Sequence, residues 1–233
     1  MREICYLCGR NIDKKNRTLD HVPPQQIFPS RIRKKFNLSK LVTLPTHRKC
    51  NEAFQADEVY FFNKIGMVDY KNPVLREVWY DIRRSAQKPE SQRFNQMLLS
   101  QVREEAKTPG GIIIPGKVAI EYDDTRINRV LWKIVRGLFF IEFSRILPED
   151  TIHIVTYFQG QNLGIDPESV VKILNIVRNS DEHGQYKRIF AYKYVVNPEE
   201  KKCAAWAVLF WDRHLFLAAH HDPDCDCDKC KSR

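Results

Sequence analysis

The clearest hydrophobic periodicity lies in the second half of the chain. Between residues 125 and 147, apolar residues recur at the i, i+3, i+4, i+7 spacing that places them on one helical face. These residues are Ile127, Val130, Leu131, Ile134, Val135, Leu138 and Phe139. The spacing predicts a long core helix that residues 123–125 can cap, that ends at Pro148 and that exposes its arginines to solvent.

Four other segments have the apolar and β-branched composition of strands. They are residues 117–122, 151–158, 187–196 and 203–219. The last is long enough for a hairpin that turns near Asp212, and Asp166-Pro167 is typical of the start of a helix, which would run to about Asn179. Together these elements predict an α+β fold with an antiparallel sheet.

The beginning of the chain has a different pattern. Residues 1–50 are rich in turn signals and poor in helical periodicity, with a loop predicted at 22–29 and a short strand at 40–45. From Asn51 the spacing of phenylalanines and isoleucine becomes helical, and Gly66 is the expected end of that helix.

A segment rich in proline and glycine separates the two halves. Residues 74–106 are predicted to be mainly helical, with a break near Pro89, and residues 107–116 then contain the densest cluster of proline and glycine. We therefore expect a compact module at 1–66, a helical connector at 67–107 and an α+β domain at 108–233.

The net charge is concentrated in the first segment. Residues 1–50 hold 12 lysines and arginines against 3 acidic residues, which accounts for the whole net charge of +9. A concentrated basic segment indicates an anionic partner, most often nucleic acid, although a solvated basic face is the alternative. The candidate contact residues are Arg31, Arg33, Lys34, Lys35, Arg48 and Lys49, and Phe36 beside them offers a stacking surface.

Composition narrows the class of protein further. No apolar run approaches the ~20 residues of a membrane helix, and the N-terminus has no apolar stretch of signal-peptide length. We therefore expect a cytoplasmic protein with no membrane partner. Seven cysteines in such a chain are expected to be reduced thiols or metal ligands.

Two pairs of residues have the spacing of metal ligands. Cys5 and Cys8, and then His47 and Cys50, are each separated by two residues, which predicts a structural zinc site. The alternatives are a thioredoxin-like redox pair or ordinary buried thiols. At the other end, Cys225, Cys227 and Cys230 follow His220 and His221, so a second metal site or a loose reduced tail is expected there.

The order of these motifs resembles the HNH, or ββα-metal, endonuclease family. The residues that carry the resemblance are the C-x2-C pair, Asp20-His21 in "LDHVPP" and the H-x2-C pair followed directly by Asn51, and it covers residues 3 to about 65. It implies an N-terminal ββα module with structural zinc. It also implies Asp20 and Asn51 as ligands of one catalytic Mg²⁺ or Mn²⁺ ion, His21 as general base, and Asn37 as the residue that orients the histidine.

The chemistry of those residue types agrees with phosphodiester hydrolysis. A neutral imidazole can accept a proton from water near neutral pH, and Mg²⁺ prefers oxygen ligands such as carboxylate and amide. This chain differs from the family pattern at two positions. It has Asn51 where histidine is common, and His47 where cysteine is commoner. We expect an endonuclease, with DNA as the first candidate substrate and a homodimer as one candidate assembly.

Simpler interpretations remain for each motif. Asp-His before proline is also typical of an ordinary turn, Asn51 of a helix N-cap, and Asp57 and Glu58 of exposed helix charges. The two rival functions are a zinc-containing nucleic-acid-binding module without catalysis and an adaptor whose basic segment binds an acidic protein.

Overall fold

The computed structural model describes residues 3–67, 72–108, 110–157, 167–196 and 203–222. Its helices are α1 (Ser30–Lys35), α2 (Arg48–Glu52), α3 (Gln55–Gly66), α4 (Pro73–Ala86), α5 (Gln92–Ser100), α6 (Asp124–Phe143) and α7 (Pro167–Arg178). Short 3₁₀ turns lie at Gln25–Ile27 and Pro89–Ser91. The fold is α+β, as the sequence predicts.

Among the described residues, the strands form one large sheet and three small ones. The large sheet contains β7 (Ile152–Tyr157), β8 (His183–Tyr186), β9 (Phe190–Val196), β10 (Cys203–Phe210) and β11 (His214–His221). Their order is β7-β11-β10-β9-β8, and every neighbouring pair is antiparallel. The two-stranded sheets pair β1 (Arg17–His21) with β2 (Thr43–His47), β3 (Val102–Arg103) with β6 (Ala119–Ile120), and β4 (Ala106–Lys107) with β5 (Ile113–Ile114).

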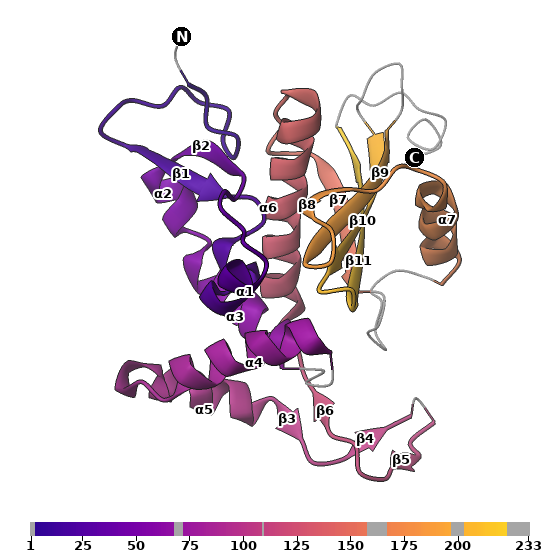
Figure 1. Ribbon diagram of the computed structural model, residues 1–233. Helices are drawn as coiled ribbons and strands as arrows, with labels where there is room; N and C mark the ends of the chain where they lie inside the picture. The colour runs from indigo at the N-terminus through magenta and orange to yellow at the C-terminus, as the bar shows by residue number, and fades with distance from the viewer. Residues whose placement is uncertain (1–2, 68–71, 109, 158–166, 197–202, 223–233) are drawn as a thin grey trace.

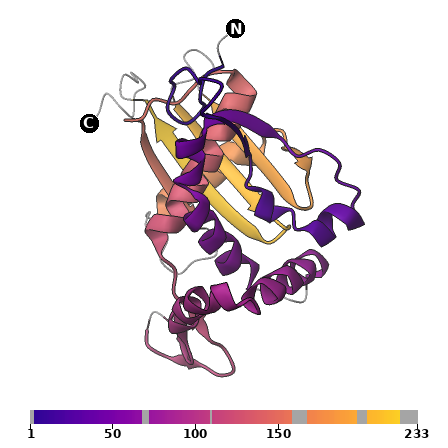
Figure 2. The same ribbon diagram turned by 90° about the vertical axis from the view of Figure 1, so that its left-hand side faces the viewer.

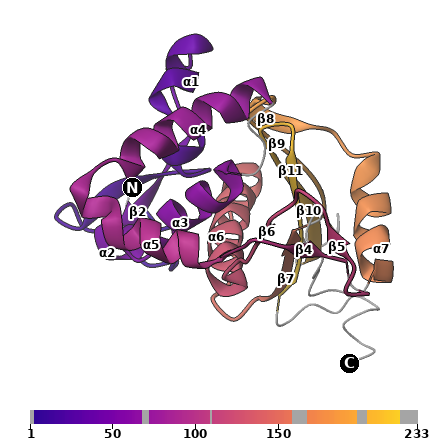
Figure 3. The ribbon, with the colours of Figure 1, turned by 90° about the horizontal axis from the view of Figure 1, so that it is seen from below.

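Helix α6 stands between the N-terminal module and the large sheet, and α7 covers the opposite face of that sheet (Figures 1 and 3). The apolar face of α6 is buried along its length, as its periodicity predicts. Val170, Ile173 and Val177 of α7 make a separate cluster with Ala207 and Leu217. The result is a layered arrangement in which α6 is shared by both halves of the chain.

One hydrophobic core runs through both halves. Tyr6 and Phe61 belong to the same cluster of buried residues as Ile134 and Trp206. In the described residues, the segments 1–66 and 108–233 therefore share this core. The small sheets β3–β6 and β4–β5 extend away from this body (Figure 2), and the predicted boundary at 107–116 lies in the β4–β5 hairpin.

The predicted hairpin of 203–219 is confirmed. Phe210 pairs with His214 across a turn in which Trp211 and Asp212 both have a φ of 54°. The buried Trp211 indole donates a hydrogen bond to the Ile27 carbonyl oxygen at 3.0 Å. This contact joins the tip of the sheet to the N-terminal module.

Several boundaries differ from the predicted ones. Residues 30–35, where no helix was predicted, form helix α1, and β2 continues through Pro45 to His47. Proline is tolerated there because β2 is in a two-stranded sheet, where one side of the strand needs no partner. Helix α6 ends at Phe143, before Pro148, because Ser144 adopts a left-handed conformation.

Candidate metal centre and the surroundings of His21

Two tight turns bring the four predicted zinc ligands together. The first turn is closed by a hydrogen bond from the Gly9 amide to the Cys5 carbonyl oxygen, with Gly9 at a φ of +71° that glycine adopts readily. The second forms where β2 runs directly into α2. The ligand atoms of Cys5, Cys8, His47 and Cys50 all lie within 4.8 Å of one another, so this cluster could hold a metal ion.

The imidazole of His47 is oriented as a metal ligand. Its Nε2 lies 3.1 Å from the Asn11 carbonyl oxygen, which can only accept a hydrogen bond, so Nε2 carries the proton. The unprotonated Nδ1 faces the sulfur atoms, 3.3 Å from Cys8 Sγ and 3.9 Å from Cys50 Sγ. A backbone carbonyl that fixes the histidine tautomer is a common outer partner of metal sites.

The charges of the cluster also favour a bound cation. Although burial raises the pKa of the Cys5 thiol, its hydrogen bonds with the Thr46 hydroxyl and the neighbouring backbone lower that pKa to about 6. Burial and the nearby Cys5 and Cys8 sulfurs raise the pKa of Cys50 to about 12. Thiolates that repel one another in this way are stabilised by a metal ion between them.

The Asp-His pair ends β1, as the resemblance implies. Asp20 pairs with Leu44 and His21 with Thr43 across the hairpin. Neighbouring residues of a strand point in opposite directions, and Asp20 is buried while His21 is half-buried. Burial, together with the positive charges of Arg33 and Lys133, lowers the pKa of His21 despite the opposing effect of Asp20. The imidazole is therefore neutral at physiological pH and able to accept a proton.

The carboxylate of Asp20 is occupied by two side chains that the sequence did not suggest. Lys133 Nζ lies 2.9 Å from Asp20 Oδ1 and 2.8 Å from Oδ2, and the Tyr6 hydroxyl donates to Oδ2 at 2.5 Å. The same ammonium group contacts Glu58. Asp20, Glu58 and Lys133 are all almost completely shielded from solvent.

Lys133 belongs to a basic stripe along α6. Arg126, Arg129, Lys133 and Arg136 follow one another at intervals of three, four and three residues, which places them on one face of the helix. Each contacts the N-terminal module, and the last donates to the Leu7 carbonyl oxygen beside the metal cluster. Arg129 is exposed, as expected for the arginines of this helix, whereas Arg126 and Arg136 are half-buried, so the expectation is wrong for those two. The 3-4-3 spacing of these four basic residues within an apolar helix was the sequence feature that could have indicated a contact face.

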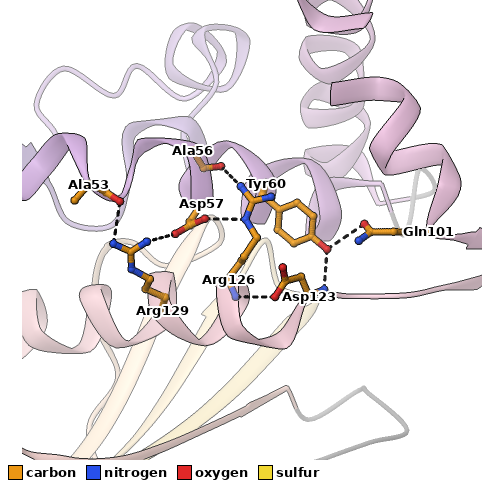
Figure 4. Close-up of polar contacts among 8 residues, drawn as sticks. All are labelled: Ala53, Ala56, Asp57, Tyr60, Gln101, Asp123, Arg126 and Arg129. Carbon is orange, nitrogen blue, oxygen red and sulfur yellow. Dashed lines mark hydrogen bonds and ion pairs between the residues drawn. The ribbon is translucent and has the colours of Figure 1, made fainter. Parts of the chain in front are cut away.

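Asp57 and Glu58 are not exposed helix charges, contrary to prediction. Figure 4 shows Asp57 of α3 held by two arginines of α6, Arg126 at 2.7 Å and Arg129 at 2.5 Å. Arg126 also donates to the Ala56 carbonyl oxygen in α3 and Arg129 to the Ala53 carbonyl oxygen at the end of α2, and the Tyr60 hydroxyl joins the same contact to the start of α6. These polar bonds fix α6 against α3.

We expect Asp57→Asn to lower the free energy of unfolding by about 1–2 kcal/mol, because both arginines lose an ionised partner but are partly exposed and screened. The measurement is urea unfolding followed by circular dichroism. Glu121→Gln is the matched control, since it breaks a solvent-exposed pair with Arg103 and should leave the free energy of unfolding essentially unchanged. Equal effects of the two substitutions would contradict this role of Asp57.

A catalytic divalent cation on Asp20 does not fit this arrangement. Both carboxylate oxygens already accept hydrogen bonds, and an ammonium group stands where a metal ion would have to bind. Asn51 lies inside α2, half-buried, and the N-cap of that helix is His47, so the N-cap interpretation of Asn51 is wrong. Within the described residues, no hydrogen bond links the Asn51 amide to Asp20.

Asn37 has a structural explanation of its own. It follows the end of α1 with a φ of 50°, a left-handed conformation that asparagine tolerates, and its side chain is exposed. In the part of the chain that the structure describes, Asn37 makes no hydrogen bond to His21. Its predicted part in orienting the histidine stays a prediction.

The predicted nucleic-acid contacts lie on an exposed surface, with one exception. Arg31, Lys34, Lys35, Arg48 and Lys49 are exposed, although Arg31 and Lys35 lie within 4 Å of Glu77. Arg33 instead turns inward, and its Nε is buried without a hydrogen-bond partner among the described residues. Because its charge acts on His21, Arg33 belongs to the surroundings of that imidazole.

The predicted second metal site cannot be placed, since Cys225, Cys227 and Cys230 lie outside the described residues. His220 and His221 are neighbours in β11 and therefore point to opposite faces of the sheet. Cys203 is disulfide-bonded, so the expectation that all seven cysteines are thiols or metal ligands is wrong for this residue. Cys5, Cys8 and Cys50 are free.

Comparison with family models, with curated proteins and with solved structures finds no match to this chain. Among the helices of the described residues, none combines the length and apolar character needed to cross a membrane.

Proposed function

We propose that the protein is an endonuclease that hydrolyses phosphodiester bonds of nucleic acid, with DNA as the first candidate substrate. The proposal rests on one arrangement: antiparallel strands β1 and β2 lead into helices α2 and α3, a four-residue cluster brings the Cys5–Cys8 turn to the junction of β2 and α2, and the Asp-His pair ends the first strand. This is the layout that the motif order in the sequence implies for an HNH module.

His21 supplies the general base in this proposal. Its lowered pKa keeps the ring neutral, so it can take the proton of a water molecule whose oxygen attacks phosphorus while the bond to the leaving sugar oxygen breaks. Arg33 carries a fixed positive charge toward the same imidazole and is suited to stabilise the negative charge that develops on the phosphate oxygens. The proposed hydrolysis therefore uses His21 of β1 and Arg33 of α1.

The exposed cations of α1 and α2 supply the substrate surface. Lys34, Arg48 and Lys49 make no ion pair within the described residues and are free to meet phosphates. Phe36, 37% exposed at the end of α1, offers a ring on which an unpaired base can stack.

We assign the four-residue cluster to a structural Zn²⁺ ion, because three thiolates and one imidazole form the closed tetrahedral set that zinc prefers. Its part in the proposed reaction is to hold the hairpin and α2 in place. The cytoplasm is the proposed location, and a homodimer would allow paired nicks to become double-strand breaks.

The test is cleavage of supercoiled plasmid, single-stranded DNA and RNA, each with Mg²⁺, with Mn²⁺ and without added cation. We expect nicking by the wild type and a loss of at least about 100-fold in His21→Ala, the usual contribution of a general base. His183→Ala, a partly exposed histidine on β8, is the matched control and should cleave normally. Equal activity of the two variants would exclude His21 as the base.

A second candidate function is nucleic-acid binding without cleavage. The observation that favours it is the occupied carboxylate of Asp20. Saturable, salt-dependent binding of DNA by a protein that cuts no substrate under any of these conditions would select this function. A protein that neither binds nor cuts would favour the adaptor interpretation.

A further inference from the structure

We infer that Lys133 is a built-in cation that takes the place beside Asp20 which the HNH resemblance gives to a divalent metal ion. This chain then binds no divalent cation at Asp20, and any cleavage does not depend on one there. The part about cleavage rests on the proposed function, whereas the part about cation binding stands without it.

The hydrogen bonds of the ammonium group carry the first step. A lysine ammonium has three N–H donors, and here it donates hydrogen bonds to Asp20 Oδ1 and Glu58 Oε1, while Asp20 Oδ2 lies 2.8 Å away in the same ion pair. In the described part of the chain, its acidic partners are both buried carboxylates, and the ammonium group itself is shielded from solvent. Lys133 is therefore a positioning residue, not one that touches the substrate.

The burial of the group carries the second step. The Lys133 side chain is 1% exposed, and its Nζ also lies 5.3 Å from the centre of the Phe54 ring. A metal ion that reached Asp20 would have to displace the ammonium group into an apolar interior, where an unpaired charge is strongly disfavoured. The site is thus closed to metal ions by its own lysine.

The third line of support is the balance of charge among Asp20, Glu58 and Lys133. Asp20 and Glu58 together can hold two negative charges, Lys133 supplies one positive charge, and burial raises the pKa of Glu58. Without the lysine, two carboxylates would face one another in a buried site, which one divalent cation would neutralise. Removal of Lys133 should therefore create a metal site that the wild type lacks.

The experiment measures Mn²⁺ binding by electron paramagnetic resonance on protein whose cysteine cluster is already loaded with zinc, which Mn²⁺ does not displace. We expect no saturable Mn²⁺ binding by the wild type and a single saturable site in Lys133→Met. Adding Asp20→Asn to Lys133→Met should remove that site again. Lys133→Arg keeps the positive charge and should bind no Mn²⁺.

Lys64→Met is the matched control, because Lys64 is also fully buried but its Nζ has no hydrogen-bond partner among the described residues. That variant should gain no Mn²⁺ site. If Lys133→Met is too unstable to purify without metal, Lys133→Gln keeps both carboxylates beside a neutral polar side chain and should likewise gain a Mn²⁺ site that Asp20→Asn removes.

Three results would overturn the inference: saturable Mn²⁺ binding by the wild type that Asp20→Asn abolishes, an equal gain of Mn²⁺ binding in Lys64→Met, or no gain in any folded Lys133 variant. All three are read without a nuclease assay. A protein that cuts nothing would therefore refute the proposed function and leave this inference to be judged by Mn²⁺ binding.

Discussion

Removal of the metal ion from the Cys5, Cys8, His47 and Cys50 cluster should unfold the N-terminal module. Structural zinc contributes roughly 10 kcal/mol or more to the folding of small zinc domains, which is comparable with the whole stability of an ordinary domain. Here the shared core compensates for part of that loss. We expect Cys8→Ser to lower the free energy of unfolding by at least about 5 kcal/mol, or roughly 10–20 °C in melting temperature.

The reason for this large effect is the content of the first 50 residues. Cys5, Tyr6 and Leu7 are buried in the shared core, but the turn that holds them contains few other apolar side chains. Arg136 of α6 contacts the Leu7 carbonyl oxygen, so collapse of the turn would also release one end of the long helix. The metal cluster is therefore expected to stabilise the contact between the two halves as well as the hairpin.

The measurements are metal content by mass spectrometry and thermal unfolding by circular dichroism. Cys8→Ser should lose the zinc of this cluster. The triple serine variant of Cys225, Cys227 and Cys230 should keep it, and any additional zinc that is lost only in the triple variant would reveal a second site. A wild-type protein without zinc, or a Cys8→Ser variant that melts with the wild type, would contradict the assignment.

Local patterns in the sequence were sufficient to predict many of the helices and strands. The periodicity of α6 and the strand composition of 203–219 each reflect burial on one side of an element, so they predict that element without knowledge of its neighbours. Helix α1 was not predicted because a helix of six residues with Ile32 as its one buried residue is too short to show a period. The strand predicted at 40–45 ended at Pro45, because proline cannot donate a backbone hydrogen bond to a neighbouring strand. In the structure β2 continues to His47.

The metal cluster was predictable for the same reason, because each ligand pair lies within one turn of the chain. The surroundings of Asp20 were not. Lys133 is 113 residues from Asp20 and 75 from Glu58. The residues next to either acid in the sequence do not indicate that contact. The basic stripe of α6 could have been noticed, but its partners depend on how the two halves pack.

His220 is a buried group whose titration should be visible in stability. Its ring is surrounded by Trp132, Phe139 and Trp206, with centroid distances of 5.8, 5.4 and 6.5 Å, and both ring nitrogens lack hydrogen-bond partners in the described part of the chain. Burial, and to a smaller extent His221 and His153, lowers the pKa of His220 to about 3. The folded protein therefore resists protonation that the unfolded chain accepts near pH 6.5.

The sign of the pH effect follows from that lowered pKa. Above pH 6.5 His220 is neutral in both the folded and the unfolded protein, so its titration does not change the free energy of unfolding. As the pH falls from 6.5 toward 3, the unfolded chain binds a proton that the folded protein excludes, so stability is lost across this window. At pH 4 the loss from this one residue should be about 3 kcal/mol, or roughly 6–12 °C in melting temperature.

His220→Leu should remove this loss, because leucine has a similar size and no group to protonate. Near pH 7.5 the variant should be at least as stable as the wild type, since two buried polar atoms without partners are also removed. The comparison is the free energy of unfolding in urea for both proteins from pH 7.5 to pH 4, in which the carboxylates titrate alike and cancel. A difference between the two proteins that widens by about 3 kcal/mol toward acid pH supports a neutral, solvent-excluded His220. Parallel curves would show that the imidazole finds a partner or solvent when it is protonated.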